Sequence, residues 1–75
     1  MADNTARARA ELEGQRRAVR EHTRKWHDYP DQIDKDYAWK TIQRVQGEIA
    51  QLKRDHPSLN TRSSEDDWRP GDRAL

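Results

Sequence analysis

The sequence contains no cysteine, which excludes disulfide bridges and the zinc sites that are built on thiolate ligands. It also has no uninterrupted apolar run near the roughly 20 residues that a membrane-spanning helix needs. The first residues show neither the basic region nor the apolar region of a secretion signal. We therefore expect a soluble protein that is not exported, is located in the cytoplasm and makes no contact with a membrane.

Sequence motifs of catalysis are missing as well. Serine occurs only beyond residue 57, and there is no Gly-x-Ser-x-Gly, no glycine-rich phosphate loop and no His-Glu-x-x-His metal motif. A chain of two helices also offers little concave surface to enclose a substrate. The sequence therefore predicts a protein that binds other molecules and is not an enzyme, with no catalytic residue, no cofactor and no metal ligand.

Hydrophobic residues are scarce, at 31% of the 75 residues, whereas charged residues make up 39%. Typical domains contain about 45–50% and about 25% of these classes, respectively. A domain of this size also buries only about 60% of the surface that its unfolded chain exposes. Because disulfides are excluded, association with a second copy is the remaining way to bury more surface. We expect a homodimer.

Residues from about 4 to 28 have the composition and the periodicity of a helix. They contain no proline and are rich in alanine, arginine, glutamate and glutamine, which favour helices. Leu12, Val19 and Trp26 recur at intervals of seven, as the apolar residues of a coiled-coil seam do. Pro30 disfavours helical angles at the residue before it, so a turn is expected there.

Residues from about 34 to 56 show a clearer helical pattern, with apolar residues spaced alternately by four and three positions. Two helices joined by a short turn pack antiparallel. Positions equally far from the turn then face each other, as Leu12 and Leu52 would. The sequence therefore predicts an all-α fold in which residues 1–56 form an antiparallel two-helix hairpin.

The apolar face of the second helix is wider than one neighbouring helix covers, because Tyr37 and Trp39 lie beside its seam. The first helix has polar Gln15 and His22 at its own seam positions. A second hairpin packed against the wide face would complete a dimeric four-helix bundle. The residues expected to mediate self-association are Ala38, Ile42, Val45, Ile49 and Leu52.

Residues 57–75 combine prolines, serines and an acidic run with little apolar content, which is typical of a flexible tail. Trp68 stands out within this segment. In such a context a tryptophan indicates a short motif that docks on a partner protein and becomes ordered on binding. The alternative is that Trp68 folds back onto the open end of the hairpin and covers Leu12 and Leu52. The sequence leaves both alternatives open.

Aromatic residues surround the turn. Rings at the closed end of a hairpin usually fill the core there. Tryptophan and tyrosine also dominate the energetics of protein interfaces, and such rings can stack on single-stranded bases. The four residues are Trp26, Tyr29, Tyr37 and Trp39. From these and from the tail, we expect Trp26, Trp39 and Trp68 to be the partner-binding residues.

Basic residues of the first helix recur at intervals of three and four and gather into a stripe. Such a stripe can follow a phosphate backbone and displace its counterions. Against this, the formal net charge is only +1, and Glu13, Glu21 and Asp28 lie within one turn of the basic residues, as on an ordinary solvated helix surface. The candidate nucleic-acid-binding residues are Arg16, Arg17, Arg20, Arg24 and Lys25.

The histidine and aspartate residues do not have the spacing of a metal site. His22 and His27 are five positions apart, which places them poorly for binding one ion. The aspartates around the turn lack the central glycine of a calcium loop. Capping of the second helix, whose first turn favours carboxylates, explains Asp31, Asp34 and Asp36 better.

The leading hypothesis is a small protein-interaction module, such as an adaptor, an assembly factor or a regulator. The excess of arginine over lysine is typical of GC-rich genomes and indicates a bacterial or phage origin. The alternatives are a nucleic-acid-binding accessory protein that uses the basic stripe, and an inhibitor that covers another protein's site. A heptad hairpin is shared by too many unrelated proteins to indicate a family.

Overall fold

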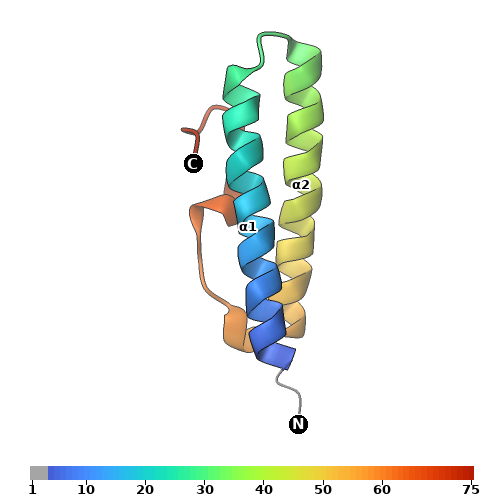
Figure 1. Cartoon of the computed structure of the whole chain (residues 1–75), viewed down its shortest axis with the longest axis vertical. Coiled ribbons are helices and arrows are strands. Elements are labelled where there is room, and N and C mark those ends of the chain that lie inside the picture. The colour runs from blue at the N-terminus through green and yellow to red at the C-terminus, as the bar shows by residue number, and fades with distance from the viewer. Residues whose placement is uncertain (1–3) are drawn as a thin grey trace.

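The computed structural model describes residues 4–75, which form two long helices followed by two short 3-10 helices. The elements are α1 (Asn4–Asp28), α2 (Gln32–Asp55), η1 (Pro57–Leu59) and η2 (Ser64–Asp67). α1 and α2 lie side by side and antiparallel, with the turn at one end (Figure 1). No strand occurs within residues 4–75. The all-α fold and the helical hairpin are thus confirmed, while residues 1–3 of the expected hairpin lie outside the described range.

The turn between the helices is short, and α2 begins slightly earlier than the sequence predicts. Its first residue is Gln32, and Asp31 occupies the N-cap position with extended backbone angles (φ −92°, ψ 138°). The side chain of Asp31 makes no capping hydrogen bond, so the expected capping role of this carboxylate is wrong. Asp34 does lie in the first turn of α2, where the helix dipole favours a negative charge.

The two helices bury a narrow apolar seam. Val19 and Ile42 are completely buried within it, and burying a side chain of this size stabilises a fold by about 1.5–3 kcal/mol. Because only this seam is apolar, neither helix of residues 4–75 is apolar over enough length to cross a membrane. The buried core consists of Ala8, Leu12, Val19, Ile42, Val45, Ile49, Leu59 and Trp68.

The C-terminal segment (residues 57–75) forms a third layer on the hairpin. It leaves α2 at the open end and runs back along α1 toward the turn (Figure 1). Leu59 is 3% exposed and Trp68 is 2% exposed, and both belong to the same core as the seam residues. The chain therefore buries Leu59 and Trp68 against its own helices, and the third large apolar side chain of this segment, Leu75, is partly buried against the same core.

This arrangement differs from the flexible tail that the composition indicates. Trp68 folds back, but not over Leu12 and Leu52 at the open end as that alternative supposed. Its ring lies 5.7 Å from the ring of Trp26 and 6.0 Å from that of Trp39, between centroids. Local composition underestimates the order of the segment because its stabilising contacts are made with residues far away in the sequence.

Candidate interaction surface

The basic stripe of α1 is largely occupied by the C-terminal segment. The Arg16 guanidinium donates to both carboxylate oxygens of Asp66, with N–O distances of 3.0 and 2.8 Å, and to the carbonyl oxygen of Thr61 at 3.0 Å. Only 7% of Arg16 is exposed. Arg16 therefore acts as a buried link between α1 and the C-terminal segment.

Two further ion pairs extend this link. The Lys53 ammonium lies 2.9 Å from the second oxygen of Asp66, and the Arg20 guanidinium lies 2.8 Å from a carboxylate oxygen of Glu65. Gln46 of α2 donates to the backbone carbonyls of Glu65 and Trp68. Glu65 and Asp66 of the acidic run are thus bound by Arg16, Arg20 and Lys53, and the backbone beside them is bound by the amide of Gln46. These four side chains come from both long helices.

These contacts shift the pKa values of the paired groups. Burial disfavours the charged form of Asp66, but hydrogen bonds from Arg16 and Lys53 outweigh it and hold the pKa of this carboxyl below its ordinary value. Burial likewise opposes ionisation of Glu65, and hydrogen bonds from Ser63 and Arg20 nevertheless lower its pKa. The hydrogen bond to Asp66 raises the pKa of Arg16.

The remaining members of the stripe do not form one open surface with Arg16 and Arg20. Arg24 is exposed, and its Nε donates to the backbone oxygen of Leu75 at 2.9 Å. Arg17 and Lys25 are exposed, and Lys25 lines a groove between α1 and α2. The five candidate nucleic-acid-binding residues are therefore divided between the covered and the open sides of α1.

The three tryptophans expected to bind a partner pack against one another. Trp68 is buried, while Trp26 and Trp39 are partly buried against the core. The ring of Trp26 meets that of Trp68 edge to face, and the indole N–H of Trp68 donates to the carbonyl oxygen of Arg73 at 2.9 Å. In this arrangement the rings join the hairpin to its third layer.

The residues expected to mediate self-association are covered within one chain. Ile42 is fully buried, Ile49 is 1% exposed, and Ala38 and Val45 are nearly buried. Leu52 is partly buried against the same core. Apart from Tyr37, the wide apolar face of α2 is thus covered by α1 on one side and by Leu59 and Trp68 on the other.

Two large apolar side chains remain in solvent, both on α2 near the turn. Ile33 is 70% exposed and Tyr37 is 66% exposed, and no other large hydrophobic side chain of residues 4–75 is classed as exposed. They lie one helical turn apart and line a shallow groove of about 190 Å³ together with Asp36 and Lys40. We call these four residues the tip surface.

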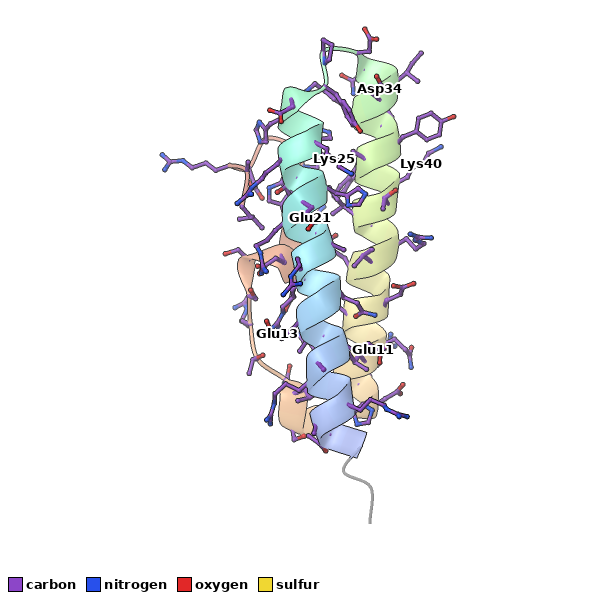
Figure 2. The ribbon with its side chains drawn as sticks, in the orientation of Figure 1. Glu11, Glu13, Glu21, Lys25, Asp34 and Lys40 are labelled. Atoms are coloured by element: carbon purple, nitrogen blue, oxygen red, sulfur yellow. The ribbon has the colours of Figure 1, made fainter. Side chains whose placement is uncertain are left out.

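Tyr37 also borders a second groove, which is lined by residues of both α1 and α2 and has a volume of about 220 Å³. Tyr29 and Ala38 line it with the charged side chains of Lys25 and Asp34. Figure 2 shows Lys25 and Asp34 on the two helices beneath the turn. The aromatic surface of Tyr37 is therefore accessible from both sides.

The sequence indicates Tyr37 as a ring beside the seam and as one of four aromatic residues around the turn, but not as a partner-binding residue, and it does not single out Ile33. A signal was present, because Ile33 does not fit the spacing of four and three that runs through Ala38 and Ile42. An isoleucine outside the buried face of a helix must either meet another segment or remain exposed. Only the course of the C-terminal segment, which leaves Ile33 uncovered, shows which of the two applies.

Acidic side chains lie on both sides of the turn in the sequence, close to the residues of the tip surface. Asp28, Asp31 and Asp34 are exposed, and their carboxylates make no hydrogen bond or ion pair with any residue of the described range. Asp36 accepts a hydrogen bond from the amide of Gln32 at 2.8 Å. Within residues 4–75 no three histidine, aspartate or glutamate side chains come close enough together to hold a metal ion.

The lysine within this acidic region is directed elsewhere. The ammonium of Lys35 donates to the backbone carbonyl of Trp26 and lies 4.3 Å from the centroid of the Trp26 ring. Lys40 lies at the other edge of the tip surface, 5.8 Å from the ring centroid of Tyr37. Along the start of α2, exposed carboxylates thus precede the exposed ammonium of Lys40, while Lys25 supplies an exposed cation on α1.

Comparisons with protein-family models, with curated proteins and with solved structures gave no match for this chain. Its function is therefore inferred from the side chains described above.

Proposed function

We propose that the chain is a small protein-interaction module that contacts its partner through the tip surface. The observation that supports this proposal is the exposure of Ile33 and Tyr37, at 70% and 66%, whereas the other large apolar side chains of residues 4–75 are covered or partly covered. Covering an isoleucine stabilises a complex by about 1.5–3 kcal/mol, and tyrosine is among the residues that contribute most at interfaces. An adaptor, an assembly factor or a regulator would each use such a surface.

The helical setting makes the tip surface suitable for recognition. Ile33 and Tyr37 belong to a regular helix whose backbone hydrogen bonds are formed, so their relative position is fixed before a partner arrives. Side chains at positions i and i+4 present the spacing with which helices enter apolar grooves or pack on other helices. An inhibitor that covers a partner's site would use the same residues and is a variant of this proposal.

A nucleic-acid-binding function has less support. Arg16 and Arg20 already pair with Asp66 and Glu65, so a phosphate backbone would have to displace two carboxylates from them. Of the five candidate residues only Arg17, Arg24 and Lys25 are exposed, and three cations are few for strong binding to a polyanion, which rises with the number of neutralised phosphates.

The homodimer remains a prediction, as do a cytoplasmic location and a bacterial or phage origin. The reason for expecting a dimer was an apolar face too wide for one helix to cover. Leu59 and Trp68 of the same chain lie on that face. A four-helix bundle built on Ile42 and Ile49 would therefore require the C-terminal segment to leave its position, and sedimentation equilibrium at micromolar concentration would measure the oligomeric state.

The proposal is tested by capturing partners from a lysate of the source organism on the immobilised chain. The variant Ile33→Ala/Tyr37→Ala removes the exposed apolar side chains while keeping good helix formers. The matched control is Arg44→Ala/Glu48→Ala, which changes two exposed residues of α2 with the same spacing. A partner retained by the wild type and the control and lost by the variant supports the tip surface, whereas equal retention by all three overturns it.

A further inference from the structure

The carboxylates near the turn form no ion pair within the described part of the chain. Asp28, Asp31 and Asp34 are exposed and make no side-chain hydrogen bond or ion pair with residues 4–75. Elsewhere the chain does pair its carboxylates, as the contacts of Glu65 and Asp66 with cations of the helices show. The tip therefore carries unpaired negative charge next to exposed apolar surface.

Folding does not account for one of these carboxylates. Asp28 is the last residue of α1, where the helix dipole disfavours a negative charge. Asp31 at the N-cap of α2 makes no capping hydrogen bond, but it lies with Asp34 at the end of α2 where the dipole favours a negative charge. Stability of the monomer thus gives little reason for an acidic residue at position 28.

The lysine nearest to Asp31 and Asp34 in sequence does not pair with them. Lys35 is half-buried, and its ammonium is bound to the carbonyl oxygen of Trp26 and positioned over the Trp26 ring. Lys40 lies further from the turn, as Figure 2 shows in relation to Asp34. Lys25 of α1 is exposed and lines the same groove as Asp34, but it forms no ion pair within residues 4–75, so these carboxylates remain available to a cation of another molecule.

We propose that the tip surface binds a cationic amphipathic helix of a partner protein. Apolar side chains of that helix would cover Ile33 and Tyr37, and its lysine or arginine side chains would pair with Asp28, Asp31 and Asp34. A helix fits better than an added strand, because α2 forms its own backbone hydrogen bonds and offers no free sheet edge. This inference rests on the proposed function and adds the chemistry of the partner.

The test uses the full chain and a synthetic probe. The probe is a helical peptide of leucine and lysine with leucines spaced by three and four, and its counterpart has glutamate in place of lysine. Binding is measured by fluorescence anisotropy at low and at physiological salt. We expect the lysine peptide to bind, the glutamate peptide not to bind, and salt to weaken the complex, because exposed charge pairs are screened.

Two sets of variants decide whether binding is specific to the tip. Asp28→Asn/Asp31→Asn/Asp34→Asn removes three negative charges there, and Glu11→Gln/Glu13→Gln/Glu21→Gln removes three exposed charges from α1 below Lys25 (Figure 2). We expect the first set to weaken binding of the lysine peptide on the order of tenfold, and the second to leave it within about twofold. Equal weakening by both sets, or no binding at low salt, overturns the inference.

The outcome also separates this inference from the proposed function. Should Ile33→Ala/Tyr37→Ala abolish capture of the natural partner while the three asparagine substitutions leave that capture unchanged, the tip surface binds a protein without using its carboxylates. In that case the interaction module stands and the cationic partner is rejected. If neither variant affects capture of the natural partner, both proposals are rejected.

Discussion

Arg16 of α1 and Asp66 of η2 are 50 positions apart in the sequence and form a two-point ion pair, with N–O distances of 3.0 and 2.8 Å. The side chains are only 9% and 13% exposed, so water competes weakly for either partner. Lys53 adds a contact of 2.9 Å to the same carboxylate from α2. Asp66, with Arg16 and Lys53, therefore joins the C-terminal segment to both long helices.

Substituting Arg16 by glutamine should lower the free energy of unfolding by about 2 kcal/mol. The change leaves Asp66 largely buried with Lys53 as its remaining cation, and an uncompensated buried carboxylate is strongly destabilising. Urea denaturation followed by circular dichroism measures the effect. The neighbouring Arg17→Gln variant is the control, and since Arg17 is exposed it should stay within about 0.5 kcal/mol of the wild type. Equal stability of the two variants would contradict the structural role of Arg16.

The free energy of unfolding should decrease as the pH falls below about 4.5, the ordinary pKa of a glutamate. Folding lowers the pKa of both Glu65 and Asp66, so the unfolded chain binds more protons in this range and acid favours it. The stabilisation is fully present above the unfolded pKa values and is lost as the pH falls through the lower folded values.

Urea denaturation between pH 3 and pH 7 measures this dependence. The variant Glu65→Gln/Asp66→Asn should be less stable at neutral pH and should lose less stability on acidification than the wild type. Asp67→Asn is the matched control, because Asp67 is exposed and its contact with Arg62 is long, at 3.7 Å. An unchanged acid dependence in the double variant would show that these two carboxylates do not control it.

Truncating Trp68 to alanine should lower the melting temperature by at least about 12 °C. Trp68 is 2% exposed, and removing a buried tryptophan side chain costs about 3–5 kcal/mol, with each kcal/mol worth about 4–8 °C in a domain of this size. Thermal unfolding followed by circular dichroism measures the shift. Trp68→Phe should retain part of the stability and remain folded. A melting temperature unaffected by Trp68→Ala would instead indicate that the tryptophan does not pack on the hairpin in solution.

The double variant Ile33→Ala/Tyr37→Ala should change the free energy of unfolding by less than about 0.5 kcal/mol. Both side chains are largely exposed, and alanine favours a helix at least as well as isoleucine or tyrosine does. Chemical denaturation measures this in parallel with partner binding, which should be lost. A large destabilisation would mean that Ile33 and Tyr37 support the fold, and would remove the main reason for assigning them to an interface.

The sequence by itself determined the hairpin. The spacing of Leu12, Val19 and Ile42, with Pro30 between them, predicts two antiparallel helices, because a helical face repeats within a few residues and a proline constrains its immediate neighbour. Asp31 occupies the N-cap position, but its expected capping hydrogen bond is absent. Whether a side chain reaches a backbone N–H depends on local torsion angles that the residue type does not fix.

The tertiary structure decided what the C-terminal segment and the charged residues do. Arg16 belongs to a regular basic stripe, and Asp66 to an acidic run, so each looks like solvated surface when its own segment is considered alone. Their pairing, the burial of Trp68 and the exposure of Ile33 all depend on where the C-terminal segment passes over the helices, and its ion pairs with α1 join residues 45 to 50 positions apart. Helical periodicity contains no information on that path, because it reports only which side of one helix is apolar.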